Sequence, residues 1–296
     1  MKKRKDQLSY HLMLTPGMIF LILFSFIPML GIIMAFQNYI PAKGILGSPW
    51  VGLENFKYML EIPDSARILG NTLIIAIGKI VLGTIIPITF ALLLNEIRLM
   101  WAKKTIQTIV YLPHFLSWAV LAAVVVNIFD LNGPINGLLG LFGIKSTMFL
   151  VSNHWFRPIL IGTDVWKEFG YGSIVYLAAL TGIDPGLYEA ASIDGANRLK
   201  QLVHVTLPGI MPIIMLMIAM NLGNILNAGF DQVFNLYNPI VYQTGDIIDT
   251  YVYRVGLVGM QYSFATAVGL LKSVVGCILL LSANKLSKKL ANMQIF

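Results

Sequence analysis

The chain has 296 residues, of which 57% are apolar and only 12% are charged, and its mean hydropathy is +0.75. A soluble domain carries about a quarter of its residues as Asp, Glu, Lys and Arg, so this composition excludes a soluble globular protein and predicts a membrane protein. The single cysteine, Cys277, excludes an intrachain disulfide, and its apolar neighbours predict a buried, unreactive thiol.

Six apolar stretches are long enough to cross a bilayer as helices. A crossing of about 30 Å needs about 20 mostly apolar residues, and the stretches that meet this are 12–36, 71–95, 106–129, 158–181, 208–229 and 264–283. Strands of a membrane barrel would be about half as long and would alternate in polarity. Because lipid offers no hydrogen bonds, each segment must satisfy its own backbone. We therefore expect an all-α membrane protein with six transmembrane helices.

The first stretch follows a basic run and is longer than the apolar core of about 7–15 residues of a signal peptide. No cleavage pattern follows it promptly, so we expect it to remain as an uncleaved span. The domains predicted are a cytoplasmic tail over 1–11, a membrane domain over 12–283, and a second cytoplasmic tail over 284–296.

The basic residues predict the orientation. With the N-terminus inside, the cytoplasmic segments hold twelve Lys and Arg, the outer segments hold six, and three lie within spans. This bias places both termini in the cytoplasm of a multi-pass protein of the cell membrane. It also accounts for the net charge of +7, so we expect no nucleic-acid partner.

The connection between the fourth and fifth spans, about 182–207, is long and polar. Asp184-Pro185 predicts a helix start, Gly195 interrupts the helix, and a second short helix is expected before Pro208 opens the fifth span. Ala190 and Ala191 are small enough for a partner groove to approach the backbone. This pattern is typical of a helix that docks in a groove and transmits rigid-body movement.

At this connection the sequence resembles a known family. Residues 180–197, LTGIDPGLYEAASIDGAN, with Leu207-Pro208, resemble the EAA signature of binding-protein-dependent ABC importer permeases, E-A-A-x3-G-x9-I-x-L-P. Val205 stands where the family usually has isoleucine. VGLENF at 51–56, NT at 71–72, YLPHFLSW at 111–118 and DVWKE at 164–168 extend the resemblance to nearly the whole chain. The chain is most similar to the carbohydrate branch, the LplB-like polysaccharide permeases.

The resemblance implies a type I ABC importer (MetI-like) permease fold, in which the EAA loop forms a cytoplasmic coupling helix. It implies these partners: a second homologous permease, two cytoplasmic ABC ATPases that bind ATP and Mg, an extracytoplasmic sugar-binding protein, usually a lipoprotein in Gram-positive bacteria, and an oligosaccharide. The residues it assigns to ATPase coupling are Tyr188, Glu189, Ala190, Ala191, Asp194, Gly195, Ala196, Leu207 and Pro208.

The chain itself is expected to be non-catalytic. It has no G-x-x-x-x-G-K-[ST] motif to hold a nucleotide phosphate, and its four histidines show no metal-ligand spacing. We therefore expect neither a cofactor nor a metal in this chain, and ATP chemistry falls to the partner.

Polar residues within the spans suggest part of a substrate pathway. An ionisable residue in a span costs at least a few kcal/mol, so it usually faces protein or water. Asp164 and Glu168 share one face of the fourth span, Lys167 lies three residues from Asp164 and can neutralise it, and Trp166 lies off that face. The alternatives left open are an ion pair that locks helices together and a wall of the sugar pathway.

In the fifth span, Asn221, Asn224 and Asn227 recur every three residues, which predicts one polar arc on a helix. They lie at a similar depth to Asp164, so the two patches are expected to meet in one cavity, unless the asparagines only join neighbouring helices. The candidate pathway residues are Ser117, Trp118, Asp164, Trp166, Glu168, Asn221, Asn224 and Asn227. Ser117 and Trp118 rest on the family resemblance alone.

Two other classes of protein are alternatives to a sugar importer. A permease of the same architecture with a peptide or amino-acid cargo is disfavoured by the polysaccharide-permease stretches. The other class is a membrane-embedded enzyme or an ion-coupled carrier; such a carrier would be expected to show pseudo-symmetric halves, and no internal repeat is found in this sequence.

Overall fold

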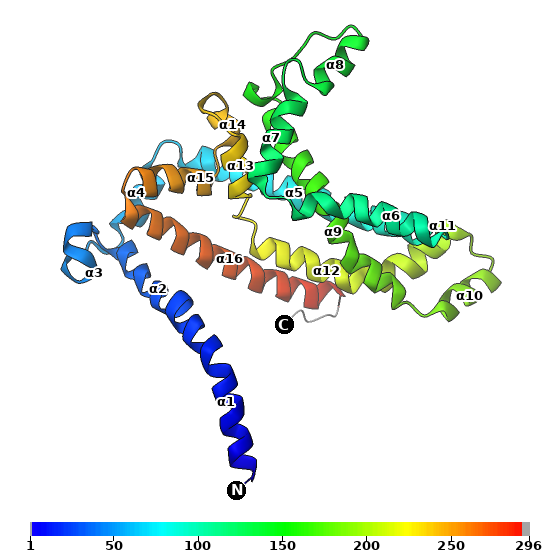
Figure 1. The fold of residues 1–296 in the computed structure, drawn as a ribbon, viewed down its shortest axis with the longest axis horizontal. Coiled ribbons are helices and arrows are strands. Elements are labelled where there is room, and N and C mark those ends of the chain that lie inside the picture. Colours follow the sequence, from blue (N-terminus) through cyan, green and yellow to red (C-terminus); the bar gives the residue numbers. More distant parts are fainter. Residues whose placement is uncertain (1, 292–296) are drawn as a thin grey trace. The chain divides into compact units, whose positions relative to one another are not determined.

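The computed structural model describes residues 2–291, and the elements are labelled in Figure 1. The expectations placed on Met1 and on residues 292–296, at the ends of the two predicted tails, lie outside this range. The described part of the chain is helical and contains no strand, only an isolated bridge between Gln37 and Trp50. The chain divides into two units by its internal contacts.

The first unit comprises residues 2–65 and Tyr251–Val274. Its elements are α1 (Lys2–Leu21), η1 (Ile22–Phe26), α2 (Ile27–Met29), η2 (Leu30–Phe36), η3 (Pro41–Lys43), α3 (Gly44–Gly47), α4 (Glu54–Glu61), η8 (Tyr253–Val258) and the start of α16 (Tyr262–Ala291). Asn55 ties α4 to the end of the first span, because its amide donates to the carbonyls of Ala35 and Gln37 at 2.9 and 3.0 Å.

The second unit comprises Ala66–Thr250 and residues 275–291. It contains α5 (Ser65–Asn95, from Ala66 on), α6 (Met100–Tyr111), η4 (Leu112–Phe115), α7 (Trp118–Phe129), α8 (Pro134–Leu141), η5 (Phe149–Val151), α9 (Phe156–Thr181), α10 (Pro185–Ile193), α11 (Arg198–Gln201), η6 (Leu202–Thr206), α12 (Leu207–Gly223), α13 (Phe230–Leu236), η7 (Pro239–Val241), α14 (Tyr242–Gly245), the start of α15 (Ile248–Val252) and the end of α16.

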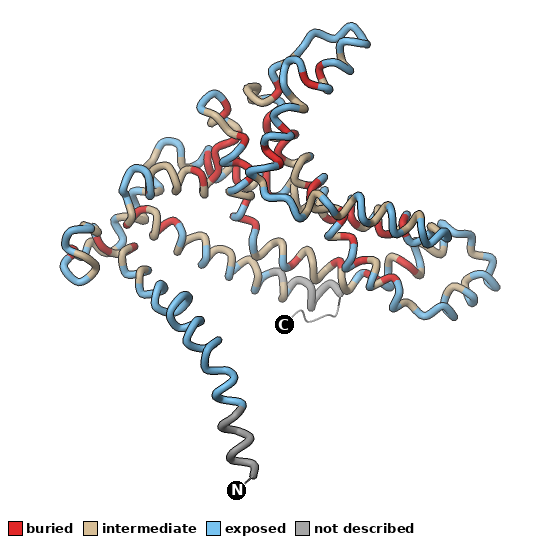
Figure 2. The backbone as a smooth tube through the Cα atoms, in the orientation of Figure 1, coloured by how far each residue is buried: buried red, intermediate tan, exposed pale blue. Residues whose placement is uncertain are grey.

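Two apolar clusters hold the second unit together, and Figure 2 marks their buried residues in red. The larger one includes Ile75 on α5, Leu160 on α9 and Val233 on α13, all fully buried. The smaller one joins Ala91 at the end of α5 to Tyr176 on α9 and Ile210 on α12. The smaller cluster therefore lies beside the connection between α9 and α12 that the sequence singled out.

Within the described residues, five helical stretches are long and apolar enough to cross a membrane: Tyr10–Phe36, Ser65–Asn95, Trp118–Leu141, Arg198–Gly223 and Tyr262–Ser282. The predicted fourth span is also a helix, α9, of 26 residues. Every 18-residue stretch of α9 contains Asp164, Lys167 and Glu168, and these charges keep it out of the apolar set. The number of six spans remains a prediction.

The prediction of one continuous helix over 106–129 is wrong. α6 ends at Tyr111, a short 3-10 turn follows, and α7 starts at Trp118. Pro113 has no backbone N–H to continue the helix, and Ser117 then caps α7 by accepting a hydrogen bond from the Val120 N–H at 3.4 Å. The expectation of a buried Cys277 is also wrong, since this thiol is exposed on α16.

The fifth helix begins earlier than expected. Residues 198–223 run through α11, η6 and α12 without a break, so the second short helix predicted after Gly195 is the first part of the span. The π-helical segment η6 contains His204, the residue four before Pro208, just as η1 contains Phe24, four before Pro28. A proline ring clashes with that carbonyl in a regular α-helix, and the wider π turn relieves the clash.

Candidate functional site

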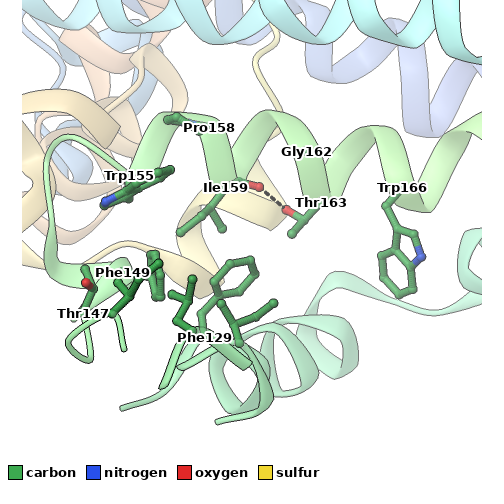
Figure 3. A pocket seen from close by; sticks show the side chains of 12 residues that line it. Phe129, Thr147, Phe149, Trp155, Pro158, Ile159, Gly162, Thr163 and Trp166 are labelled. Carbon is green, nitrogen blue, oxygen red and sulfur yellow. Dashed lines mark hydrogen bonds between the residues drawn. The ribbon is translucent and has the colours of Figure 1, made fainter. Parts of the chain in front are cut away.

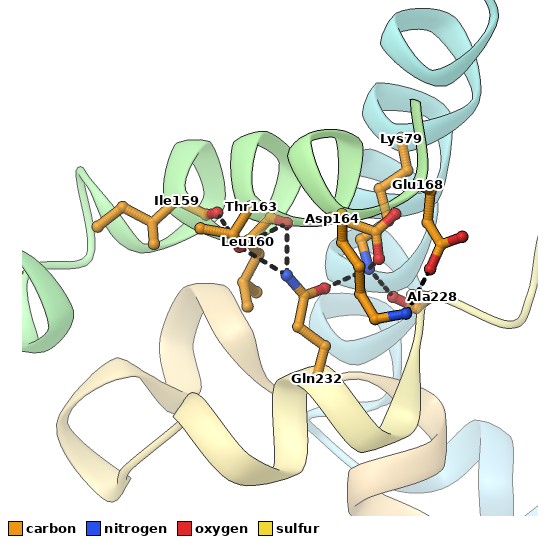
Figure 4. Close-up of polar contacts among 9 residues, drawn as sticks. Lys79, Ile159, Leu160, Thr163, Asp164, Glu168, Ala228 and Gln232 are labelled. Atoms are coloured by element: carbon orange, nitrogen blue, oxygen red, sulfur yellow. Dashed lines mark hydrogen bonds and ion pairs between the residues drawn. The ribbon is translucent and has the colours of Figure 1, made fainter. Parts of the chain in front are cut away.

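A buried lysine on α5 is tied to two other elements. Lys79 donates to Asp164 Oδ1 of α9 at 2.9 Å, to the Ala228 carbonyl at 2.8 Å and to Gln232 Oε1 of α13. Figure 4 shows the three acceptors converging on its ammonium group. An ammonium has three protons, so these contacts use all of its donors.

The predicted pairing of Asp164 with Lys167 is wrong. Lys167 donates instead to Glu168 Oε1 at 2.7 Å and to the His114 carbonyl at 2.9 Å. His114 completes the group with a contact of 2.7 Å between its Nδ1 and Glu168 Oε2. The three-residue spacing did not determine the partner of Asp164, because the Lys167 side chain reaches His114, which lies in the break between α6 and α7.

Gln232 is a site residue that the sequence analysis did not identify. Its side chain is fully buried, accepts from Lys79, and donates to the Leu160 carbonyl and to Thr163 Oγ1 at 2.7 and 2.8 Å. It lies on α13, in an outer segment where no helix was predicted. The available signal for a buried polar residue was a glutamine between Asp231 and Val233, in a segment that also contains Phe230.

A polar pocket of about 370 Å³ lies beside this network. The polar side chains that line it come from α5, α9 and the end of α12 with the segment after it; they are Lys79, Asp164, Glu168, Tyr171, Asn221, Asn224 and Asn227. The structure thus brings together the two polar patches of the fourth and fifth spans. We call this cavity the polar pocket.

The three asparagines reach the polar pocket by a different route from the one expected. Only Asn221 lies on α12; Asn224 is the residue that ends the helix, and Asn227 follows in irregular backbone. The predicted helical arc is therefore wrong. The Asn224 amide bonds back to the Met220 carbonyl at 3.3 Å, a local contact that competes with continued helix.

The remaining candidate pathway residues line other cavities. Ser117 and Trp118 line a pocket of about 410 Å³ with Lys167, Asp231 and Asn235. Trp166 lines an apolar pocket of about 710 Å³ with aromatic residues that include Phe129, Phe149 and Trp155 (Figure 3). This agrees with the position of Trp166 off the face of Asp164 and Glu168.

The connection between α9 and α12 forms a short capped helix. Asp184 caps the start of α10 by accepting from the Gly186 N–H at 2.9 Å. Gly195 ends it with a φ of +76°, and the N–H groups of Gly195 and Ala196 bond back to the carbonyls of Ser192 and Ala191 at 3.1 and 2.9 Å. This is the Schellman arrangement, which needs a residue in left-handed backbone.

The residues assigned to coupling lie mostly on the surface of this connection. Figure 2 shows α10 largely in the colour of exposed residues. Glu189, Ala190, Asp194, Gly195 and Pro208 are exposed, while Tyr188, Ala191, Ala196 and Leu207 are half-buried. The Tyr188 hydroxyl lies 3.0 Å from Thr206 Oγ1. That contact ties α10 to the fifth helix, and Leu207 packs on the smaller apolar cluster.

No group of three or more His, Cys, Asp or Glu side chains within the described residues is arranged to hold a metal ion. The carboxylates of the polar pocket have cationic partners instead: Asp164 pairs with Lys79, and Glu168 pairs with Lys167. The arrangement offers hydrogen-bond partners to a polar ligand between helices, and the exposed helix α10 joins two of those helices.

Comparison with known proteins decides the family. The family described as "Binding-protein-dependent transport system inner membrane component" matches residues 83–292. The chain belongs to this family. It is therefore a permease component of an ABC transporter, a multi-pass membrane protein and not an enzyme, as the EAA-like motif indicated.

Two relatives of this permease come from Bacillus subtilis (strain 168). The polygalacturonan/rhamnogalacturonan transport system permease protein YteP is 43% identical, over 98% of this chain and 91% of the relative. Protein LplB is 41% identical, over 97% and 90%. The expected similarity to LplB-like permeases is confirmed.

A solved structure has the same fold. A chain in the crystal structure of a bacterial ABC transporter involved in the import of the acidic polysaccharide alginate is 39% identical, with a TM-score of 0.90 over 98% of each chain. A second structure, of the bacterial alginate ABC transporter with an alginate pentasaccharide-bound periplasmic protein, matches with 38% identity and a TM-score of 0.90, over 99% of this chain and 98% of that one. The expected type I importer permease fold is confirmed.

Gly170 on α9 packs closely against Val110 on α6. A Cβ on Gly170 would lie 2.3 Å from the Val110 carbonyl oxygen, so Gly170→Ala must push the two helices apart. We expect it to lower the free energy of unfolding by about 1–3 kcal/mol, measured by SDS-driven unfolding in mixed micelles. Gly162→Ala is the control on the same helix, because nothing lies within 4 Å of its Cβ position. Equal stabilities of the two variants would contradict the close contact.

Proposed function

We propose that this permease forms half of the translocation pathway of an ABC importer for an oligo- or polysaccharide. The cargo class is supported by the relatives, whose names specify polygalacturonan, rhamnogalacturonan and galactooligosaccharides, and by the alginate importer. The polar pocket supports it as well, since amide and carboxylate groups suit a ligand with many hydroxyls.

The observation that carries the proposal is the position of α10. It is an exposed helix, capped at both ends, and it joins α9, which bears Asp164 and Glu168, to the helix that bears Asn221. A partner that moves α10 as a rigid body therefore acts on two walls of the polar pocket at once. In this proposal Glu189, Ala190, Ala191 and Gly195 present the coupling surface.

The assembly we propose contains a second, homologous permease, two cytoplasmic ATPases that bind ATP and Mg, and an extracytoplasmic binding protein that delivers the sugar. Both termini and α10 lie on the cytoplasmic side, with the tails at 1–11 and 284–296 flanking the membrane domain at 12–283. The excess of Lys and Arg in the predicted cytoplasmic segments supports this orientation.

The pathway role is tested in proteoliposomes that contain the assembled importer. We expect Asp164→Asn and Asn224→Ala each to lower uptake and sugar-stimulated ATP hydrolysis by about three- to tenfold, as the loss of one hydrogen bond to cargo would. Asn127→Ala on α7 is the control: like Asn224 it donates to the carbonyl four residues earlier, at 2.8 Å, but it lies outside the polar pocket. Unchanged uptake in both pocket variants would remove this cavity from the pathway.

A further inference from the structure

The cations beside the polar pocket have few protons left for a ligand. Lys79 spends all three on Asp164, Ala228 and Gln232. Lys167 donates two to Glu168 and His114, and its ammonium also lies 5.9 Å from the centre of the Trp118 ring. Lys79 is the one cation among the described residues that line the pocket, so a carboxylate there would find no charged donor with a free proton.

The pocket does keep free acceptors and neutral donors. Glu168 is 44% exposed and each oxygen accepts one bond, so further lone pairs remain. Asp164 bonds through Oδ1, and Asn221 has no side-chain hydrogen bond to the described part of the chain. Asp164 pairs with Lys79 and Glu168 pairs with Lys167, so a carboxylate in the pocket would meet the open carboxylate oxygens with no spare cation to offset them.

We infer that the polar pocket recognises uncharged, hydroxyl-bearing parts of the cargo and disfavours a carboxylate. Hydroxyls donate to Glu168 and Asp164, whereas a carboxylate meets like charge in a partly desolvated cavity. The inference rests on the proposed role of the pocket in the sugar pathway. For an acidic cargo, it follows that the negative charges are neutralised by groups outside this pocket.

The test compares two probes, an oligogalacturonate and its uncharged methyl ester, in proteoliposomes with the assembled importer. Uptake of each is measured, and the ratio of acidic to neutral uptake is compared between variants with the same binding protein. We expect Asn221→Asp, a change of equal size at an unbonded side chain, to lower this ratio by about fivefold. Glu168→Gln, which removes a negative charge, raises it by about the same factor.

The control is Asn95→Asp at the end of α5, which adds the same charge outside the pocket and leaves the ratio unchanged. The inference is overturned if the uptake ratio of Asn221→Asp equals that of the wild type. It is also overturned if the ratio of Glu168→Gln falls below that of the wild type.

Asn221→Ala separates this failure from that of the proposed function. If it lowers uptake of both probes while Asn221→Asp leaves the ratio unchanged, the pathway stands and the charge preference is wrong. If it changes the uptake of neither probe, the pathway through this pocket fails and the inference fails with it.

Discussion

Gly195→Val is expected to abolish sugar uptake while the permease still accumulates in the membrane. Gly195 has a φ of +76°, a conformation that a β-branched residue adopts only at a cost of about 1–3 kcal/mol. Among the described residues, and apart from its own chain neighbours, nothing lies within 4 Å of its Cβ position, so the damage is confined to the end of α10. Loss of the Schellman bonds then disorders the surface that we propose docks on the ATPase.

Gly143→Val provides the matched control. Gly143 lies just after α8, has a φ of +72° and has the same open surroundings as Gly195. The N–H of the next residue, Ile144, donates to the Leu139 carbonyl at 3.1 Å. The backbone strain is the same, but the site is remote from α10 in sequence. We expect ATPase subunits to co-purify with Gly143→Val and not with Gly195→Val.

Gly195→Asn tests the backbone cause directly. Asparagine tolerates left-handed backbone better than other residues with a side chain, so this variant should retain a large part of the uptake. Full uptake by Gly195→Val would contradict the role of this turn.

Lys79→Met is expected to destabilise the permease by about 3–5 kcal/mol, because it leaves Asp164 charged and partly buried without its cation. It also removes the donor to the Ala228 carbonyl and to Gln232. The free energy of unfolding is measured by SDS-driven unfolding in mixed micelles.

The double variant Lys79→Met, Asp164→Leu should recover part of this loss, since it removes the unpaired charge. Lys145→Met, at an exposed lysine after α8, should be neutral. A stability of Lys79→Met equal to that of Lys145→Met would show that the network contributes nothing.

Local signals in the sequence were sufficient to predict where α10 starts and ends. Asp184 before Pro185 starts α10, and Gly195 ends it, because capping depends on residues within one turn of the helix end. The long apolar runs likewise predicted helices, because a long segment in lipid must satisfy its backbone hydrogen bonds within itself.

Contacts between distant segments could not be predicted in this way. The partner of Asp164 is Lys79, 85 residues earlier, whereas spacing along α9 favoured Lys167. The same limit hid Gln232, whose three bonds all reach other elements. Asn224 and Asn227 were placed in the right cavity for a wrong reason, because helix periodicity cannot reveal where a helix stops.

Cross-linking from the tip of α10 tests the central claim most directly. Ile193 is 87% exposed, so Ile193→Cys in a Cys277→Ser background presents a single reactive thiol on this helix. Leu141→Cys on α8, 80% exposed, is the control. In the assembled importer we predict that a short bifunctional reagent joins Ile193→Cys, and not Leu141→Cys, to the ATPase subunit. Cross-links from Ile193→Cys that reach only this chain's own helices, with the ATPase bound, would contradict the account.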